Sequence, residues 1–310
     1  MKQLILIFGL LIPLFMTAQG QSEAPSSSEL SRHPIKQVRV NDLEYHYIEA
    51  GTGETIFFLH GFPDLAGTWD ETIDSMSQEY RCIAPFLRGY YPTDMAADGD
   101  YHPVTIARDI DAMAQKLGID RYYVVGQDWG ASVTYSIVSQ FPEKVIKATT
   151  IAIPHSSAIK LRPRLIYRAR HFVKFRNEEK SVRYTRKDNF KYLDVLYKRW
   201  SPGWEEYTAT AELIKKTFRL EGRLEAALGY YWSLAKGGDE EDAILNKVPE
   251  VPLLAIAGAD DGALTMTTFR RMEKKMPDNV RILVNEDAGH FLHQEVPQWF
   301  IKNLREFLKE

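Results

Sequence analysis

The sequence predicts an α/β fold in which a mostly parallel sheet carries helices on both faces. Three observations predict it: short apolar runs rich in β-branched residues, helical spacing between them, and polar or glycine-rich segments where the runs end. Such alternation of strands and helices favours a parallel sheet covered on both sides. Strand-like runs are absent between residues 154 and 247. We therefore expect a core of residues 33–153 and 248–310, with a helical cap inserted at 154–247.

The first half of the chain supplies its elements in regular succession. Residues 37–49 alternate apolar and polar side chains around Asn41-Asp42, which predicts a two-stranded hairpin. Continuous apolar runs then predict buried strands at 55–59, 82–86, 122–125 and 145–153. Between the strands, helices are expected near 67–78, at 106–117, where apolar residues recur at helical spacing, and at 131–138.

The second half of the core resumes after the cap. An apolar run predicts a strand at 251–258, followed by a helix near 265–275 and a strand at 281–284. The last helix carries an apolar residue at every fourth position, so these side chains share one face: Val296, Phe300, Leu304 and Leu308. These elements complete the α/β pattern.

The N-terminus is predicted to be a secretory signal peptide and not part of the fold. Lys2 supplies a positive charge, residues 4–15 form an apolar run, and Ala18-Gln19-Gly20 suits cleavage. The run is shorter than the roughly 20 residues that span a bilayer, and an uncleaved anchor is the alternative. We expect a signal peptide at 1–20, a flexible leader at 21–32, and a secreted or periplasmic mature protein.

Composition narrows the class of protein. The chain has 310 residues, 45% of them hydrophobic, and a formal net charge of -3. This length can bury a large core, and the charge gives no reason to expect a nucleic-acid partner. Cys82 is the only cysteine, so no internal disulfide can form, and its apolar neighbours predict an inert buried thiol.

The motif around which the chain is organised is Gly126-Gln127-Asp128-Trp129-Gly130. It joins a predicted buried strand to a predicted helix, and the glycines on either side of Asp128 suit a very tight turn. This arrangement resembles the nucleophile elbow, usually written G-x-S-x-G, with aspartate in the place of serine. A carboxylate there can attack carbon and form an ester, whereas serine-esterase chemistry is excluded. For the motif taken alone, a solvated turn aspartate is the alternative.

Two further polar signals follow predicted strands near the C-terminus. Asp260 and Asp261 come after the strand at 251–258, and His290 comes after the strand at 281–284. The order nucleophile, acid, histidine is that of the α/β-hydrolase fold, so we expect His290 to be the base. The two aspartates compete for the acid role, and the G-x-x-D pattern favours Asp261.

A fourth signal, His60-Gly61-Phe62-Pro63, follows the strand at 55–59. The backbone N–H groups of Phe62 and of Trp129, the residue after the nucleophile, could form an oxyanion hole. An ordinary Gly-Pro turn is the alternative for this segment.

Together these motifs resemble the epoxide hydrolases of the α/β-hydrolase superfamily, over essentially the whole mature chain. The resemblance rests on HGFPD at 60–64, RGYYPTD at 88–94, GQDWGA at 126–131, GADD at 258–261 and GHFLHQEVP at 289–297. It implies that Asp128 opens an epoxide to form an alkyl ester. It further implies that water activated by His290 and Asp261 hydrolyses this ester to a vicinal diol, with no cofactor or metal.

In that family two cap side chains, usually tyrosines, donate hydrogen bonds to the epoxide oxygen. The segment Leu228-Gly229-Tyr230-Tyr231-Trp232 resembles the family's second-tyrosine segment, which implies Tyr231, with Tyr230 as the fallback. His171 stands at the position of the first tyrosine, four residues before Phe175, and departs from the commoner pattern. A secreted bacterial subgroup is similar in pairing a cap histidine with a tyrosine, and an imidazole N–H can donate as a phenol does. A structural cap histidine is the alternative.

Haloalkane dehalogenases are the nearest alternative, because they form the same aspartate ester. They need two donors for the leaving halide, and Phe62 stands where an asparagine commonly supplies the second, with Trp129 as the first. A fluoroacetate dehalogenase usually has arginine at the position of Trp129. From other classes, a non-catalytic binder and a secreted factor acting on a host protein are the alternatives.

The cap is rich in basic residues, especially at 160–191. Such a segment is usually a solvated helical face, and recruitment of acidic partners or of a membrane is the minority interpretation. We expect a small apolar epoxide and water as partners, with no nucleic acid and no stable membrane anchor. The sequence leaves open whether the protein forms a homodimer.

Overall fold

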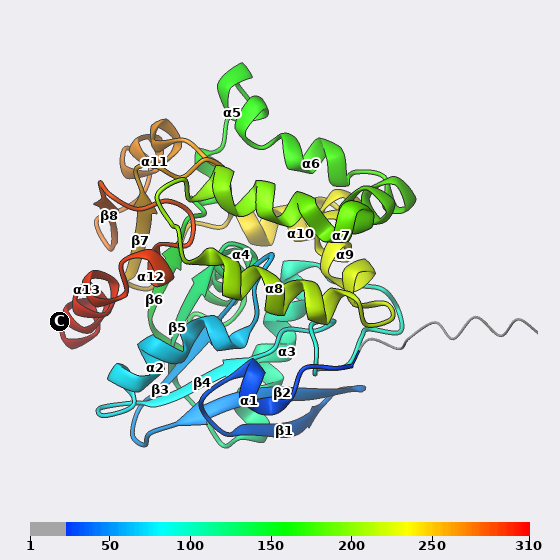
Figure 1. Ribbon diagram of the computed structural model, residues 1–310. Coiled ribbons are helices and arrows are strands. Elements are labelled where there is room, and N and C mark those ends of the chain that lie inside the picture. The colour runs from blue at the N-terminus through cyan, green and yellow to red at the C-terminus, as the bar shows by residue number, and fades with distance from the viewer. Residues whose placement is uncertain (1–22) are drawn as a thin grey trace, which may run out of the picture.

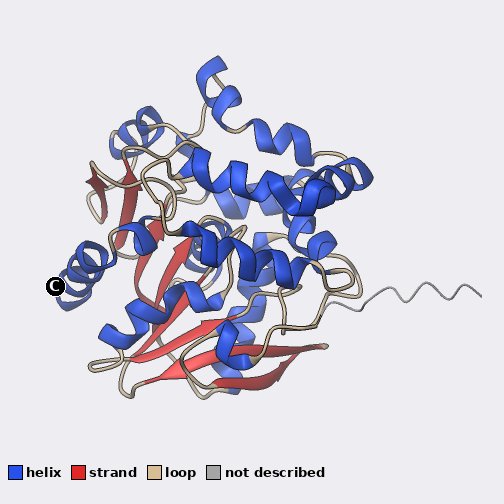
Figure 2. Cartoon of the chain, in the orientation of Figure 1, coloured by secondary structure: helices blue, strands red, loops and turns tan. Residues whose placement is uncertain are grey.

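The computed structural model describes residues 23–310, which form a sheet flanked by helices and a helical layer above it (Figures 1 and 2). The signal peptide expected at 1–20 lies outside the described residues. Within 23–310, every helix is too short or too polar to span a bilayer.

Eight strands form a single sheet in the order β1-β2-β4-β3-β5-β6-β7-β8. They are β1 Ile35–Val40, β2 Leu43–Ala50, β3 Thr55–Leu59, β4 Arg81–Pro85, β5 Tyr122–Gln127, β6 Val145–Ile151, β7 Leu253–Gly258 and β8 Val280–Asn285. Strand β2 pairs antiparallel with β1 and with β4, and all other neighbours pair parallel. The predicted mostly parallel sheet is confirmed, and Asn41-Asp42 joins the predicted hairpin.

Helices cover the sheet on both faces, which explains why β3, β5 and β7 are buried along their whole length (Figure 1). Helix α2 packs with α13 on one face, and α3 packs with α4 on the other. The core helices are η1 Ala66–Trp69, α2 Asp70–Met76, α3 Pro103–Lys116, α4 Trp129–Gln140, α11 Met266–Glu273, α12 Leu292–Glu295 and α13 Pro297–Lys309. The apolar stripe of α13 is buried as its spacing predicts, at Phe300, Leu304 and Leu308.

Every regular element between β6 and β7 is a helix, and these helices lie over the carboxyl ends of the strands (Figure 1). They are η2 Ser156–Ala158, α5 Pro163–Arg168, α6 Arg170–Phe175, α7 Glu178–Trp200, α8 Tyr207–Phe218, α9 Arg223–Lys236 and α10 Asp239–Asn246. Helix α7 leaves helical geometry at Lys187–Phe190, where φ is positive at three successive residues. The predicted inserted helical cap is confirmed.

The strand order reverses beside β3, because β4 lies on one side of it and β5 on the other. Loops that leave β3 and β5 therefore diverge and open a crevice at the carboxyl ends of these strands. Phe62 follows β3 and Asp128 follows β5, so the topology brings both residues to this crevice.

The expectation of a flexible leader at 21–32 is wrong for the second half of this segment. Ser27–Leu30 forms helix α1, and Ser26 caps it in a capping box with Glu29. The Ser31 hydroxyl then donates a 2.6 Å hydrogen bond to Asp70 on α2. A serine-rich composition is typical of linkers, but serine is also a preferred N-cap residue. Composition alone therefore gave the wrong expectation here.

His293 makes the fold sensitive to acid. It is buried, and its Nε2 lies 2.7 Å from the Thr68 hydroxyl. Burial, followed by the charge of His290, lowers the pKa of His293 from 6.5 to about 3. Between pH 6.5 and about pH 3, His293 is protonated in the unfolded chain and neutral in the folded chain. Protonation therefore removes stability as the pH falls from 6.5 towards 3.

We expect the free energy of unfolding to fall with decreasing pH more steeply in the wild type than in His293→Gln, which lacks the titrating group. The difference in slope should be about 1.4 kcal/mol per pH unit between pH 6 and 4.5. Denaturant titrations of both proteins across that range measure it. Parallel slopes would show that His293 does not stay neutral in the folded protein.

Candidate active site

Asp128 occupies a strained turn between β5 and α4. Its φ is 51° and its ψ is -116°, a backbone conformation that residues with side chains rarely adopt. The turn is tight enough that a Cβ atom on Gly126 would overlap the carbonyl of Gly130, and one on Gly130 would overlap that of Leu59. Glycine is therefore required on both sides. This turn places the Asp128 carboxylate beyond the carboxyl end of β5.

The Asp128 carboxylate receives one hydrogen bond on each oxygen. The Phe62 backbone N–H donates to Oδ1 at 2.9 Å, and His290 Nε2 lies 3.2 Å from Oδ2. Within the described residues, these are the two hydrogen bonds of this side chain, and neither comes from the backbone N–H of Trp129. Of the two amides expected to form an oxyanion hole, the structure therefore directs that of Phe62 at the carboxylate.

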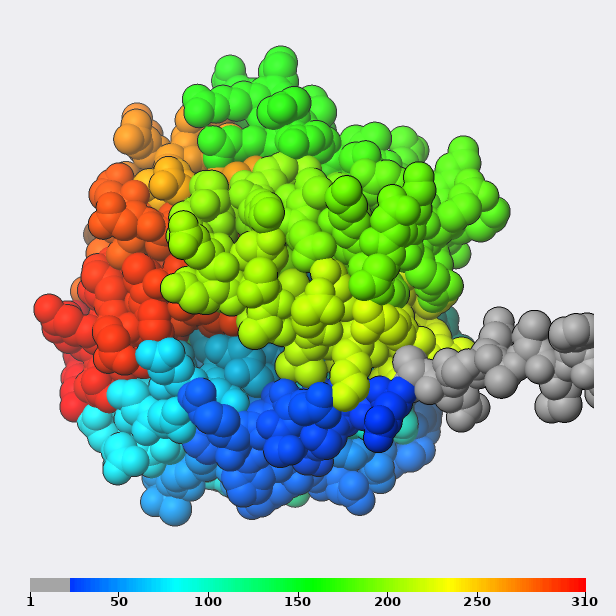
Figure 3. Space-filling view, in the orientation of Figure 1, coloured from blue at the N-terminus to red at the C-terminus, as the bar shows by residue number. Residues whose placement is uncertain are grey.

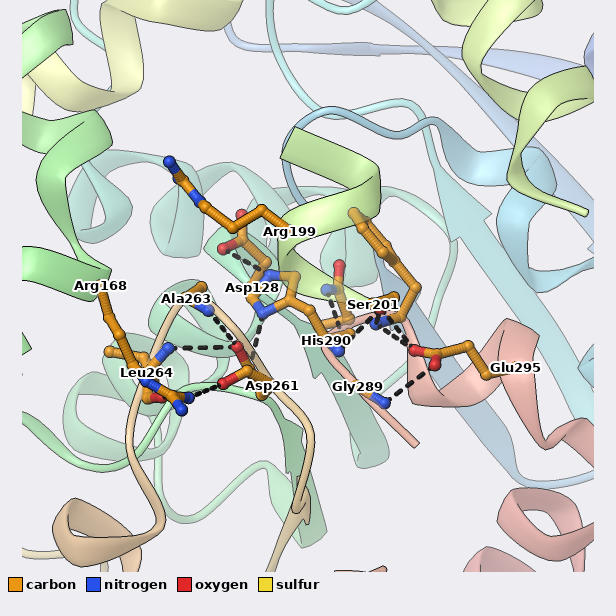
Figure 4. A network of polar contacts seen from close by, with 12 residues as sticks. Asp128, Arg168, Arg199, Ser201, Asp261, Ala263, Leu264, Gly289, His290 and Glu295 are labelled. Carbon is orange, nitrogen blue, oxygen red and sulfur yellow. Dashed lines mark hydrogen bonds and ion pairs between the residues drawn. The ribbon is translucent and has the colours of Figure 1, made fainter. Parts of the chain in front are cut away.

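Asp261 lies on the other side of His290 (Figure 4). Its Oδ2 is 2.9 Å from His290 Nδ1, while its Oδ1 accepts the backbone N–H groups of Ala263 at 2.6 Å and Leu264 at 3.1 Å. Asp260 is exposed to solvent. His290 thus lies between Asp128 and Asp261 and contacts both carboxylates, whereas Asp260, within residues 23–310, forms no hydrogen bond with these three side chains.

The two carboxylates control the charge of His290. Burial alone would lower the pKa of this imidazole, but Asp261 and Asp128 outweigh it and raise the pKa from 6.5 to about 10. With both aspartates ionised, His290 is therefore an imidazolium at neutral pH.

The end of α7 holds the loop that carries His290, and this support was not expected from the sequence. The Ser201 hydroxyl accepts the N–H groups of His290 at 2.9 Å and Phe291 at 3.1 Å, and donates to Glu295 at 2.6 Å. The Trp200 carbonyl accepts the N–H groups of both His290 and Gly262 at 3.1 Å. Of the supporting residues Trp200, Ser201 and Glu295, only Glu295 could have been found from the sequence, because it lies in the motif at 289–297. The cap therefore fixes the histidine loop and the acid loop together.

An aromatic cluster made by Phe62, Trp129, Phe172, Phe175 and Tyr231 surrounds the site. The ring of Tyr231 lies 4.9 Å from that of Trp129 and 5.5 Å from that of Phe62. The indole N–H of Trp129 is buried and has no partner among the described residues. The cluster suits an apolar ligand with a polar atom facing the unpaired donor.

The two adjacent tyrosines of α9 have different surroundings. Tyr230 donates a 2.9 Å hydrogen bond to the Arg88 carbonyl and stacks on Tyr101. Tyr231 packs in the aromatic cluster, and burial, followed by the charge of Asp128, raises its pKa well above the usual range. Tyr231 therefore stays a neutral phenol within the aromatic cluster. The ring of Tyr230 also lies 5.8 Å from that of Trp129, but its hydroxyl is bonded to Arg88.

His171 of α6 is buried beside Tyr231, with the two ring centres 5.9 Å apart. Burial, followed by the charge of Arg199, lowers the pKa of His171 well below its usual range, so the imidazole is neutral. Arg199 Nη2 lies 3.4 Å from His171 Nδ1, and a guanidinium can only donate. This contact favours the tautomer in which Nδ1 accepts and Nε2 carries the proton. No pattern in the sequence indicated a role for Arg199.

Within residues 23–310, no three histidine, cysteine or carboxylate side chains are grouped as a metal ion would require. Cys82 is buried, and burial raises its pKa to about 12, as befits an unreactive thiol. The titratable groups near the elbow include Asp128, His290 and Asp261, with the cap side chains His171 and Tyr231.

Residues 54–297 match the family described as alpha/beta hydrolase fold. Because the match covers most of the chain, the protein belongs to the α/β-hydrolase family. The AB hydrolase superfamily protein YfhM of Bacillus subtilis (strain 168) is 28% identical, over 88% of this chain and 96% of that protein.

Two further relatives are named as epoxide hydrolases. The soluble epoxide hydrolase of Corynebacterium sp. (strain C12) is 25% identical, over 91% of this chain and 98% of its own. The crystal structure of the Bacillus megaterium epoxide hydrolase with an inhibitor matches with a TM-score of 0.77 at 25% identity, covering 89% of this chain and all of that one. The resemblance to epoxide hydrolases that the motifs indicated is confirmed by these relatives.

Proposed function

We propose that this protein is an epoxide hydrolase that converts a small apolar epoxide to a vicinal diol through an ester on Asp128. The observation that carries the proposal is a carboxylate at the nucleophile elbow, bonded to His290 and surrounded by an aromatic cluster with a neutral phenol. The names of the relatives support the substrate class. Purified protein offered a panel of epoxides, with the diol measured, tests it.

In the first step Asp128 Oδ2 leaves its contact with His290 and bonds to one epoxide carbon, while Oδ1 keeps the hydrogen bond from the Phe62 N–H. The ring C–O bond at that carbon breaks, and its electron pair passes to the epoxide oxygen. That oxygen takes up one proton. The product of the step is an alkyl ester whose carbonyl oxygen, Oδ1, faces the Phe62 amide.

Ester formation also converts His290 into a base. The pKa of His290 is high because two carboxylates flank it, and the ester removes the charge of one of them. The pKa must then fall, and the imidazolium releases a proton that balances the one gained by the epoxide oxygen. Neutral His290 accepts a proton from water, which attacks the ester carbon. The tetrahedral intermediate, stabilised by the Phe62 amide, breaks its bond to the diol oxygen, which takes the remaining proton of the attacking water. This releases the diol and restores the Asp128 carboxylate and the His290 imidazolium.

Tyr231 and His171 supply the hydrogen bonds to the epoxide oxygen in this proposal. A phenol with a raised pKa keeps its O–H, and a neutral imidazole accepting at Nδ1 has its N–H at Nε2. Both side chains therefore offer a donor on the cap side of Asp128. Tyr230 is less suited, because its hydroxyl already donates to Arg88.

Tyr231→Phe is expected to slow ester formation by about 10²-fold, the low end for a positioned general acid, because His171 remains. No ester should accumulate, since hydrolysis of the ester does not use this hydroxyl. Rapid-quench single turnovers with mass analysis of the protein measure both quantities. Tyr230→Phe is the matched control and should open the epoxide at close to the wild-type rate. A defect in Tyr230→Phe alone would reassign the donor.

Asp261→Asn is expected to lower turnover by roughly 10²-fold or more, because His290 loses the carboxylate that orients it and stabilises its positive form. Asp260→Asn makes the same charge change one residue away, on an exposed side chain, and should turn over normally. Steady-state diol production by the two variants is the measurement. The reverse order of activity would exchange the two aspartates.

Haloalkane dehalogenase is a second candidate function, favoured by the unpaired indole N–H of Trp129. A leaving halide needs donors, and this N–H is one. The side chain of Phe62, at the position where a second donor is commonly found, has none. Measuring halide and diol in parallel on haloalkanes and epoxides separates the two functions.

We further propose that residues 1–20 are a cleaved signal peptide and that the mature protein is exported. A positive residue, an apolar run and a small-x-small site support this proposal. The mass of the protein recovered from outside the cytoplasm should correspond to a chain that begins at Gln21. An N-terminal peptide that retains Met1 in the recovered protein would contradict it.

A further inference from the structure

The outer surface of the cap at residues 159–176, here called the cap face, exposes a cluster of apolar side chains that the proposed reaction does not use. Six of the ten large exposed apolar side chains in the described part of the chain lie here: Ile159, Leu161, Ile166, Tyr167, Phe172 and Val173. Leu161 is 80% exposed, and Tyr167 and Val173 are each 68% exposed. Single exposed apolar residues are normal, but a group of this kind marks an interaction surface.

The cap face is also strongly basic. It carries seven cationic residues and no aspartate or glutamate: Lys160, Arg162, Arg164, Arg168, Arg170, Lys174 and Arg176. Among residues 23–310, none of the seven forms an ion pair. The whole chain has a formal net charge of -3, so this local excess runs against the balance of the protein.

Most of the cap face is exposed, and Arg168 ties it to the core by donating to the carbonyls of Asp261 and Leu264. Helices α5 and α6 form the top of the molecule in Figure 1, and the corresponding green atoms lie at the top in Figure 3. Leu165 is the only buried residue of α5, and His171 and Phe175 are those of α6. A flat partner could therefore reach the exposed side chains without moving the core.

We propose that the cap face docks on the interfacial region of an anionic lipid bilayer. Apolar side chains of this size insert at the boundary between headgroups and acyl chains, while Lys and Arg pair with the lipid phosphates. A second copy of this chain would set seven positive charges against seven, which opposes association. Charge complementarity and the exposed aliphatic side chains together select an anionic lipid surface.

Phe172 connects this surface to the site. It is 43% exposed, yet its ring lies 5.1 Å from that of Tyr231 and 6.3 Å from that of Trp129. A docked cap would therefore present the aromatic cluster to the bilayer, where an apolar epoxide concentrates. This delivery role rests on the proposed function, whereas docking does not.

A fluorophore that senses polarity can test docking, because Cys82 is buried and its raised pKa protects it from labelling. The full chain is labelled at Val173→Cys on the cap face or at Lys302→Cys on α13, away from it. With vesicles of phosphatidylcholine and phosphatidylglycerol, emission from residue 173 should shift to the blue and that from residue 302 should not. Pure phosphatidylcholine vesicles should give little shift. Binding of the apolar residues 1–20 to the vesicles would not shift the emission from residue 173, because each label reports only the polarity around its own position.

Variants in the Val173→Cys background separate the two kinds of contact. Arg162→Glu/Arg164→Glu and Leu161→Asp/Ile166→Asp should each raise the lipid concentration for half-maximal shift by about tenfold or more. Lys116→Glu/Lys302→Glu changes the net charge as much as the first pair, at exposed sites outside the cap, and should bind normally. An unchanged label at 173, an equal shift at 302, or a shift caused by raising protein concentration without vesicles would overturn the proposal. The last result would indicate self-association.

An activity measurement tests delivery separately. Leu161→Asp/Ile166→Asp should lower kcat/KM about tenfold for an epoxide dissolved in anionic vesicles and leave kcat/KM for a water-soluble epoxide unchanged. Equal losses on both substrates would overturn delivery. If the wild type hydrolyses neither epoxide, the proposed function fails, and the fluorescence result still decides docking.

Discussion

The His290→Gln protein is expected to complete the first step and then stop, with an ester on Asp128. Ring opening uses the Asp128 carboxylate and the cap donors, whereas attack of water needs a base that glutamine cannot supply. Steady-state turnover should fall by roughly 10²- to 10⁴-fold, the usual contribution of a positioned base. Intact-protein mass spectrometry should show an increase equal to the whole epoxide, located on the peptide that contains Asp128.

A matched control for this variant is His293→Gln, which removes a second buried histidine from the same segment. His293 bonds to Thr68 and not to Asp128, so the control should turn over and carry no adduct. If His290→Gln is inactive, folded and free of adduct, the histidine is needed before the ester forms. The order of steps proposed above would then be wrong.

Asp128 itself is expected to carry oxygen from water into the reaction. In a single turnover in water enriched with oxygen-18, water attacks the ester carbon, so one labelled oxygen stays on Asp128 and the first diol is unlabelled. Peptide mass spectrometry locates the label. Direct labelling of the diol, with unlabelled enzyme, would mean that water attacks the epoxide without a covalent intermediate.

Replacement of the nucleophile gives the companion result. Asp128→Ala should lose roughly 10⁴-fold or more of the activity, the order seen when a nucleophile is removed from a hydrolase, and no adduct should form. The variant also removes one of the two carboxylates that flank His290, so its fold should be tested by thermal unfolding. Activity within tenfold of the wild type would exclude Asp128 as the nucleophile.

The regular elements of the core could be read from the sequence because each depends on a local pattern. The run at 55–59 became β3 with the same bounds, and the spacing of Phe300, Leu304 and Leu308 placed them on the buried face of α13. The expectation of a flexible leader is wrong at 26–31, because the same serines suit a linker or the N-cap of a helix. What decides between these is the contact from Ser31 to Asp70, which is distant in the chain.

Several features of the candidate site could not be decided in the same way. Neighbours such as Asp260 and Asp261, or Tyr230 and Tyr231, have the same chemistry and differ only in where their backbone directs them. The structure buries Asp261 against His290 and directs the Tyr230 hydroxyl to Arg88. A motif fixes residue types and spacing, but not which of two adjacent side chains faces the crevice.

The sequence by itself determined the order of strands and helices, the inserted cap, and an aspartate at an elbow followed by an acid and a histidine. These depend on periodicity, on glycine at a tight turn, and on motifs that are contiguous in the chain. Only the tertiary structure decided that Arg199 lies against Nδ1 of His171, that Ser201 and Trp200 hold the histidine loop, and that the cap face is left exposed. Each of these depends on contacts, or on a lack of contacts, between segments far apart in sequence. Such contacts are set by packing of the whole chain and leave no local pattern.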